Sequence, residues 1–266
     1  MTTDLQSGLA PGSARQGRDS DQHEEVLRVE GVSKRFGALQ ALQDVTFDLR
    51  NQEILAVVGA NGAGKSTLMK VLAGVHKADA GTIFVDGHPV DITSVKSSQA
   101  LGIEVVYQDL GLVPNMDVPF NLFLGRTPTR MGLFVQTRKM RERTRQVLDH
   151  LHIKGLQDLS VSVDNLSGGQ RQALAIGRTL VWDRRIVILD EPAAALGVEE
   201  TNEVLKLIEE LRQRGSSVMV VTHNMDHVFS LADRVLVMRD GRSVRQSAIS
   251  ELDADQLVQA IMLGTV

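Results

Sequence analysis

Apolar and polar residues alternate along four short stretches in the first third of the chain. These stretches are VLRVE, SKRF, VTFDL and GTIFVDG, and they lie between residues 26 and 87. A period of two places every second side chain on the same face, which is typical of a half-buried strand. The pattern therefore predicts an antiparallel sheet near the N-terminus.

Three other stretches are apolar throughout: ILAVV at 54–58, IVIL at 186–189 and VMVV at 218–221. Continuous apolar strands are typical of parallel sheets that are covered by helices on both faces. Apolar residues at helical spacing lie between them, namely Leu68, Val71, Leu72 and Val75, and then Val204, Leu205, Ile208 and Leu211. Strands that alternate with helices in this way predict an α/β fold with a doubly wound sheet.

The strand pattern fades between about residues 95 and 180, where helical and loop segments such as RKMRERTRQVLDHL predict a helical subdomain inserted into the sheet domain. The sheet domain itself is expected to cover residues 25–245, with the Asp-Gly turn of a hairpin in RDGR. Residues 1–24 are too polar to bury much surface and predict a flexible leader. Residues 246–266 contain ELDADQLVQAIML and predict a C-terminal amphipathic helix.

Composition narrows the function classes. The chain has 266 residues and a net charge of −4, which provides no general attraction for the backbone of a nucleic acid. It contains no cysteine, so a disulfide framework, a thiolate metal site and a cysteine nucleophile are excluded. No apolar run approaches the roughly 18 residues that span a bilayer, and we expect a soluble, cytosolic chain.

The first motif with chemistry is GANGAGKST at 59–67, which matches the phosphate-binding pattern G-x-x-x-x-G-K-[ST]. It follows a buried strand and opens a helical stretch, so its backbone N–H groups can surround a phosphate. Lys65 would reach the β and γ phosphates, and the Ser66 hydroxyl would bind Mg²⁺. The alternative is a glycine-rich turn without a ligand. The expected nucleotide contacts are Gly59, Asn61, Gly62, Ala63, Gly64, Lys65, Ser66 and Thr67.

Two adjacent acids, Asp190 and Glu191, follow the apolar strand 186–189. Neighbouring carboxylates repel each other unless a cation or a proton lies between them. Beside a phosphate loop, Asp190 is expected to hold the Mg²⁺ that Ser66 also holds. Glu191 is then the candidate general base for the water that attacks the γ-phosphate. In isolation the pair could equally be acids that keep a strand end soluble.

A third motif, LSGGQ, begins at Leu166 and opens a helix, which makes a second candidate anion-binding helix N-terminus. In order and spacing, GANGAGKST, LSGGQ and VILDEP resemble the ATP-binding cassette (ABC) family, over about residues 26–245. The resemblance implies a P-loop NTPase fold: a mainly parallel sheet core with an antiparallel β subdomain and an inserted helical subdomain. It also implies a dimer, in which Ser167, Gly168, Gly169 and Gln170 of one cassette close over the ATP of the other.

The resemblance assigns three more positions and exposes one departure. Gln108 matches the residue that touches Mg²⁺ and water and links the sheet to the helical insertion. His223 matches the residue that contacts the γ-phosphate, and Phe36 the aromatic that stacks on adenine; a structural histidine and a core phenylalanine are the alternatives. After the paired acids the family usually has A-L-D, whereas this chain has Gly197 in place of the aspartate. We expect hydrolysis to persist and the link between the two ATP sites to be altered.

Several stretches, among them NLFLGR and HNMDHVFSLADRVLVMRDGR, resemble single-cassette ATPases of bacterial sugar importers of the ribose, xylose and fructose type. That resemblance implies a homodimer of cassettes, membrane-spanning permease subunits and a periplasmic sugar-binding protein, at the cytoplasmic face of the inner membrane. Residues 118–126 would help form a groove for a helix of the permease. The alternatives are another ABC importer or exporter, or a soluble ABC protein acting on ribosomes or DNA.

Overall fold

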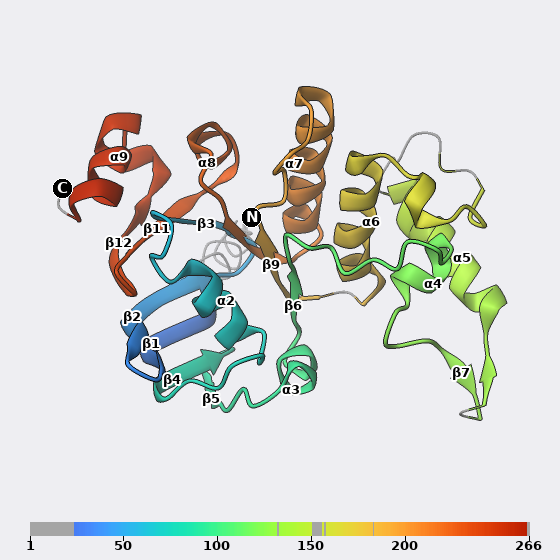
Figure 1. Cartoon of the computed structure of the whole chain (residues 1–266), viewed down its shortest axis with the longest axis horizontal. Helices are drawn as coiled ribbons and strands as arrows, with labels where there is room; N and C mark the ends of the chain where they lie inside the picture. The colour runs from blue at the N-terminus through green and yellow to red at the C-terminus, as the bar shows by residue number, and fades with distance from the viewer. Residues whose placement is uncertain (1–23, 132, 151–155, 157, 183, 265–266) are drawn as a thin grey trace, which may run out of the picture.

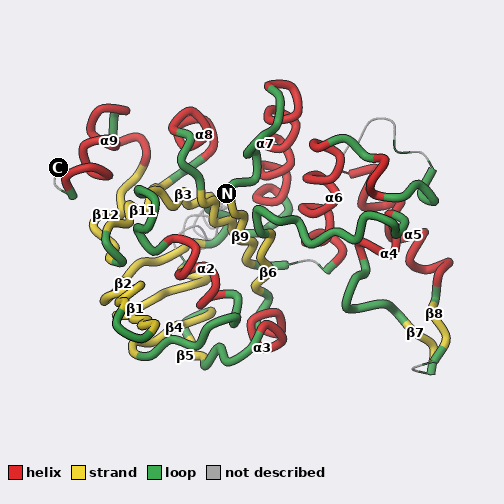
Figure 2. The backbone as a smooth tube through the Cα atoms, in the orientation of Figure 1, coloured by secondary structure: helices red, strands yellow, loops and turns green. Residues whose placement is uncertain are grey.

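A computed structural model of the chain describes residues 24–131, 133–150, 156, 158–182 and 184–264. The expected leader therefore lies outside the described residues, apart from Glu24. The described elements form an antiparallel sheet, a larger and mostly parallel sheet, and a group of helices beside that sheet (Figures 1 and 2). This arrangement is the α/β fold that the hydrophobic pattern predicted.

The antiparallel sheet has the strand order β2-β1-β4-β5. Its strands are β1 (Glu25–Phe36), β2 (Leu39–Arg50), β4 (Ala80–Val85) and β5 (His88–Val90). The stretches VLRVE and SKRF lie in β1, VTFDL lies in β2, and the first five residues of GTIFVDG lie in β4. Their buried apolar positions, such as Leu27, Leu42 and Leu49, pack with α2 and with one face of the larger sheet in a shared hydrophobic core.

The larger sheet has six strands in the order β12-β11-β3-β10-β9-β6. They are β3 (Ile54–Val58), β6 (Ile103–Val106), β9 (Ile186–Asp190), β10 (Ser217–Val221), β11 (Arg234–Arg239) and β12 (Arg242–Ala248). Every residue of β3 and β10 is buried, because helices cover one face and the antiparallel sheet, together with α2, covers the other. Only β12 is antiparallel to its neighbour, and Asp240 and Gly241 make the turn with φ of 49° and 76°.

Helices flank this sheet: α2 (Lys65–Leu72), α3 (Val95–Ala100), α7 (Val198–Gln213), α8 (Met225–Leu231) and α9 (Ala254–Leu263). The expected apolar face of α7 is confirmed at Val204, Ile208 and Leu211, and Leu207 joins it. Val75 was wrongly placed on the helix after the phosphate loop. That helix ends at Leu72, where Gly74 with φ of 73° leads the chain away, and Val75 is 47% exposed.

The helical group contains α4 (Val118–Leu122), α5 (Thr137–His150) and α6 (Gly168–Val181), with a small hairpin of β7 (Thr129–Arg130) and β8 (Phe134–Val135). It lies to one side of the six-stranded sheet (Figure 1). Two expected boundaries are corrected by strand pairing. β6 lies inside the range 95–180 but pairs with β9 in the large sheet, so the helical part begins after it. Residues 246–248 belong to β12, and the final helix begins only at Ala254.

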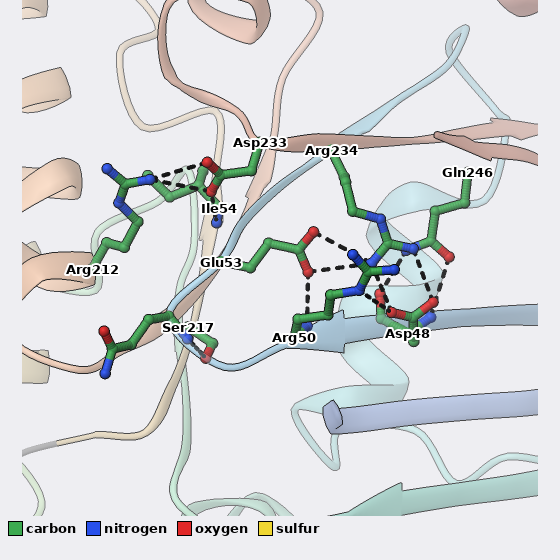
Figure 3. Close-up of polar contacts among 10 residues, drawn as sticks. Asp48, Arg50, Glu53, Ile54, Arg212, Ser217, Asp233, Arg234 and Gln246 are labelled. Atoms are coloured by element: carbon green, nitrogen blue, oxygen red, sulfur yellow. Dashed lines mark hydrogen bonds and ion pairs between the residues drawn. The ribbon is translucent and has the colours of Figure 1, made fainter. Parts of the chain in front are cut away.

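A polar cluster joins the two sheets at the amino end of β3 (Figure 3). Arg234 of β11 donates to both carboxylate oxygens of Asp48 on β2, at 2.7 and 3.0 Å, and reaches Glu53 at 3.3 Å. Glu53 is buried and also accepts from the backbone N–H of Arg50 at 2.7 Å. One guanidinium thus satisfies two acids that the sheet packing brings together.

Candidate active site

Four loops that carry predicted site residues begin at one edge of the large sheet. In its parallel register Val221 lies beside both Val57 and Asp190, and Val106 lies beside Leu189. The carboxyl ends of β3, β6, β9 and β10 are therefore level, and the segments that follow them share this edge (Figure 1). In open α/β sheets this edge is where ligands bind.

Packing fixes the backbone of the phosphate loop. Gly59 has φ of 154°, and a Cβ there would lie 2.2 Å from the carbonyl oxygen of Met238. Gly64 has φ of 100°, and a Cβ would lie 2.9 Å from the carbonyl oxygen of Ala41. Because both positions are strained and crowded for any other residue, the loop requires glycine at each end. It passes between β2 and β11 into α2.

The other predicted residues of this loop divide into buried and exposed positions. Ala63 is 3% exposed and belongs to the core beneath the loop. Asn61, Gly62 and Ser66 are exposed at the sheet edge, and Ser66 and Thr67 lie in the first turn of α2. The loop thus presents its outer backbone and the Ser66 hydroxyl to solvent, as phosphate binding would need.

The Lys65 ammonium lies over its own loop. Its Nζ atom donates to the carbonyl oxygens of Gly59 at 2.7 Å and of Ala60 at 3.0 Å. Burial lowers the pKa of Lys65, and the nearby charges of Glu191 and Asp190 oppose that shift. Lys65 thus places a cation on the phosphate loop, where the charges of the paired acids act on it.

The two acids separate at the end of β9. Asp190 is the last residue of the strand; burial and the charge of Glu191 raise its pKa, while Lys65 acts in the opposite direction. Glu191 has φ of 47°, and its N–H donates to the carbonyl oxygen of Val221 at 2.8 Å. This left-handed residue turns the chain, and the Glu191 side chain meets the segment after β10.

That segment contributes two partners to Glu191. His223 Nδ1 lies 2.7 Å from Glu191 Oε1, and the Thr222 hydroxyl lies 3.4 Å from Oε2. The His223 side chain is 76% exposed, whereas that of Glu191 is 17% exposed. His223 is therefore an exposed histidine that faces an acid, and its role as a contact for the γ-phosphate stays a prediction beside the structural alternative. Sequence reasoning missed Thr222, because a threonine at the end of an apolar strand carries no distinguishing signal.

Gln108 lies two residues beyond β6 and is exposed at the same edge. The loop that follows it is tied to α6, because Arg178 donates to the carbonyl oxygens of Leu110 at 2.7 Å and Gly111 at 3.4 Å. Burial lowers the pKa of the Arg178 guanidinium, against the charge of Glu104. Arg178 was not among the predicted residues; a single arginine within the apolar run ALAIGRTLV was the available signal.

Ser167 caps the first turn of α6. Its hydroxyl accepts from Gln170 N–H at 3.2 Å, and the Gln170 side chain accepts from Ser167 N–H at 2.9 Å. The carboxylate of Glu200, on α7, accepts from Gly169 N–H and from Gly197 N–H, both at 3.3 Å. Glu200 was also missed, because a glycine at 197 breaks the S/T-x-x-E pattern that marks such a cap.

The departure at Gly197 has no steric cause in the structure. Gly197 is the residue before α7, with φ of −69° and ψ of 169°, a conformation open to any residue. A Cβ there would have Glu200 Oε2 at 4.0 Å as its nearest neighbour. Nothing in the structure explains why glycine stands here.

Phe36, at the end of β1, is 41% exposed. Its ring packs edge-on against His76, with centroids 4.9 Å apart, and the Lys34 ammonium lies 5.5 Å from its centroid. The alternative of a core phenylalanine is therefore wrong. An exposed aromatic ring is available to stack on a planar ligand.

The phosphate loop and the LSGGQ segment lie apart within one chain. In Figure 1, α2 lies on one side of α7 and α6 lies on the other. The structure thus brings together the phosphate loop, Asp190, Glu191 and His223 at one edge. Residues 167–170 stand at a second place, on the helical group.

The predicted metal ligands are chemically matched to Mg²⁺. Ser66, Gln108 and Asp190 offer hydroxyl, amide and carboxylate oxygens, and oxygen donors are those that Mg²⁺ prefers. Within the described ranges no group of three or more His, Asp or Glu side chains could hold a metal ion by itself. A metal here would depend on phosphate and water oxygens as well. In the same ranges, no helix combines the length and apolar character needed to cross a bilayer.

Comparison with known proteins gives the family. The ABC transporter profile matches residues 42–194, more than half of the chain. The chain is 37% identical to the xylose/arabinose import ATP-binding protein XylG of Sulfolobus acidocaldarius, over 89% of this chain and 94% of that protein. It is 41% identical to the ribose import ATP-binding protein RbsA of Chromobacterium violaceum over 90% of this chain but 47% of RbsA, so it spans about half of that relative.

Solved structures give the same fold. A nucleotide-free ATP-binding cassette from an ABC transporter superposes with a TM-score of 0.78 at 24% identity, covering 88% of this chain and 97% of that one. The protein cbiO1 of Clostridium perfringens, part of the ABC transporter complex cbiONQ, superposes with a TM-score of 0.75 at 28% identity, covering 91% of this chain and 96% of that one. The resemblance drawn from the motifs is confirmed: the chain belongs to the ABC transporter family and is an ATP-binding cassette ATPase.

Proposed function

We propose that this chain energises a bacterial importer of a monosaccharide of the ribose, xylose or fructose type by binding and hydrolysing ATP. The observation that carries the proposal is the meeting of Lys65, Asp190 and the Glu191–His223 pair at one sheet edge. Relatives named as import ATP-binding proteins for xylose, ribose and arabinose support the sugar assignment. Another ABC importer or exporter is the second candidate.

In this proposal each residue at the edge has one task. Lys65 and the N–H groups of 62–67 hold the phosphates, and Phe36 stacks on the adenine. Ser66, Gln108 and Asp190 hold Mg²⁺, which when bound neutralises charge on the phosphates. Glu191 accepts a proton from the attacking water, and His223 orients Glu191 and reaches toward the γ-phosphate.

We also propose a homodimer in which Ser167, Gly168, Gly169 and Gln170 of one copy complete the ATP site of the other. The separation of α2 and α6 within one chain supports this arrangement, since residues 167–170 cannot serve a nucleotide bound in their own phosphate loop without a large movement. The α6 N-terminus, which Ser167 caps, carries the partial positive charge of a helix start and suits a phosphate that arrives from a second copy.

The permease contact is proposed at the groove between α4 and α5. A cavity of about 630 Å³ lies there, lined by Pro119, Phe120, Arg138, Arg141 and Arg145 among others. It overlaps the expected segment 118–126 only in part. Arg126 itself is not open to a partner, because it pairs with Glu104 at 3.1 Å and its guanidinium lies 5.3 Å from the Trp182 ring. A charge reversal there would disturb the fold, so Arg141 is the better probe.

The test is reconstitution of the chain with its permease and the matching periplasmic sugar-binding protein in vesicles. We expect ATP hydrolysis to rise when the sugar-loaded binding protein is added on the side opposite to ATP. Arg141→Glu should lower this stimulation and the co-purification of the permease, while ATP binding by the isolated chain stays unchanged. Arg35→Glu, on the antiparallel sheet, is the matched control. Sugar-independent hydrolysis stimulated from the ATP side would favour an exporter instead.

A further inference from the structure

One carboxylate joins the starts of two helices. Glu200 Oε1 accepts from Gly169 N–H, in the first turn of α6, and Oε2 accepts from Gly197 N–H, just before α7. The bonds from Gly169 and Gly197, with the neighbouring Ser167 hydroxyl, lower the pKa of the Glu200 carboxyl. Each helix N-terminus carries a partial positive charge and unpaired N–H groups, so an anion between them is favourable to both.

The two segments are also in close van der Waals contact. A Cβ on Gly169 would lie 3.0 Å from Cγ of Glu200, and a Cβ on Gly168 would lie 3.2 Å from Cδ2 of Leu196. Gly169 is buried by this approach. The absence of a side chain at Gly168 and at Gly169 thus allows Leu196 and Glu200 to pack against the LSGGQ segment. This contact brings the Glu200 carboxylate to the first turn of α6.

We propose that Glu200 is a positioning residue that holds segment 167–170 and the loop 194–197 together as one unit. The proposal rests on the proposed function, in which 167–170 meets the nucleotide of the partner copy and the loop begins three residues after Glu191. A phosphate that docks on the α6 turn then also fixes the start of α7. Gly197 has no side chain that could cap α7, and the Glu200 carboxylate accepts the Gly197 N–H instead.

The first test measures whether the two segments are joined, and it uses the full chain without nucleotide. Hydrogen exchange is followed by mass spectrometry in peptides that contain Gly169 and Gly197. In Glu200→Ala both peptides should exchange several-fold faster than in the parent. In Glu200→Gln the effect should be smaller, because the amide oxygen can accept one bond while its NH₂ group cannot accept the other. Glu199→Ala, the exposed neighbouring acid, is the control and should change neither peptide.

The second test measures dimer formation in a Glu191→Gln background, where slow hydrolysis preserves ATP. Glu200→Ala should raise the Mg-ATP-dependent dimer dissociation constant roughly 10-fold, as expected when charge-assisted hydrogen bonds are lost. Binding of a fluorescent ATP analogue to the monomer should stay within about 2-fold, because Glu200 does not belong to the phosphate loop of its own chain. Light scattering and nucleotide titration give the two values.

Two results would overturn the inference: faster exchange in only one of the two peptides, or tighter dimerisation of Glu200→Ala, which would mean that the carboxylate competes with phosphate. A parent protein that binds no Mg-ATP and forms no dimer would instead refute the proposed function. In that case the exchange experiment still decides whether Glu200 joins the two segments, because it needs no nucleotide.

Discussion

His223 Nδ1 lies 2.7 Å from Oε1 of Glu191, across 32 positions of sequence. The contact forms because Glu191, with φ of 47°, turns out of β9 and its N–H bonds to the last residue of β10, just before His223. The carboxylate is thereby held by the imidazole at one oxygen while the other faces Thr222. A base that is oriented in this way keeps one geometry relative to the phosphate loop.

Glu191→Gln should therefore separate hydrolysis from binding. The amide keeps the size of the side chain but cannot accept the proton, so we expect hydrolysis to fall by about 10²- to 10⁴-fold. ATP binding should persist, since Lys65, Ser66 and Asp190 are untouched. Light scattering with Mg-ATP should show a stable dimer that separates when ATP is removed. A variant that stays monomeric at saturating ATP would count against the homodimer.

His223→Ala tests the orienting role. Without the imidazole, Glu191 loses its hydrogen-bond partner at Oε1 and its fixed orientation, and we expect kcat to fall by about 10²-fold with little change in ATP affinity. His227→Ala, on α8, is the control. Wild-type turnover in His223→Ala would show that the contact with Glu191 is structural only.

Lys65→Ala should abolish tight ATP binding, with a loss of roughly 100-fold, because the ammonium supplies charge-assisted bonds to phosphates. The fold should survive, since Lys65 bonds only to two carbonyl oxygens of its own loop and burial already disfavours its charge. Lys70→Ala, an exposed lysine on the same helix, is the matched control. Nucleotide titration measures the ATP affinity, and thermal unfolding measures the stability of the fold. Undiminished ATPase activity in Lys65→Ala would refute the assignment of the phosphate loop.

Asp190→Asn should weaken Mg²⁺-dependent ATP binding and at the same time stabilise the nucleotide-free protein. Burial and the charge of Glu191 raise the pKa of Asp190, so ionised Asp190 opposes folding at neutral pH. The cost of burying the ionised carboxylate is absent below the ordinary carboxyl pKa, because Asp190 is then protonated in both the folded and the unfolded protein. As the pH rises through the raised pKa, this cost appears in full and the folded protein loses that much stability. The gain in melting temperature of Asp190→Asn should thus be present at pH 7 and vanish in acid. A lower melting temperature at neutral pH would contradict this reasoning.

Arg234→Met should destabilise the protein by roughly 3 kcal/mol, because it leaves Asp48 and the buried Glu53 without their shared cation. Lys77→Met, which breaks an exposed ion pair with Asp91, is the control and should cost less than about 1 kcal/mol. Denaturant unfolding measures both losses.

The loss of unfolding free energy caused by Arg234→Met should become smaller as the pH falls. In the wild-type protein Glu53 protonates first, because burial raises its pKa. Asp48 protonates last: burial opposes its ionisation, but the bonds and charge of Arg234 outweigh that and lower its pKa. The stability that Asp48 contributes is present above its ordinary pKa of 3.8 and is lost as the pH falls through the lowered value. A pH-independent difference would mean that packing of the arginine stem, not charge, accounts for the loss.

The sequence by itself determined the strands, the phosphate loop and the acids. Period-two and continuous apolar stretches identify half-buried and fully buried strands because side-chain burial follows local backbone geometry. Gly59 and Gly64 were readable from the phosphate-binding motif, and their φ values of 154° and 100° agree with the need for glycine at both positions. The order of the motifs then identified the family without any knowledge of contacts.

Only the tertiary structure decided which side chains meet. The pairing of β6 with β9, the contact of His223 with Glu191, the burial of Arg126 against Glu104 and the bridge from Glu200 to Gly169 all join distant segments. Such contacts depend on how sheets and helices pack, which no local pattern encodes. A glutamate one turn into a helix looks like a solvated acid until the helix beside it brings a second N-terminus to the same carboxylate.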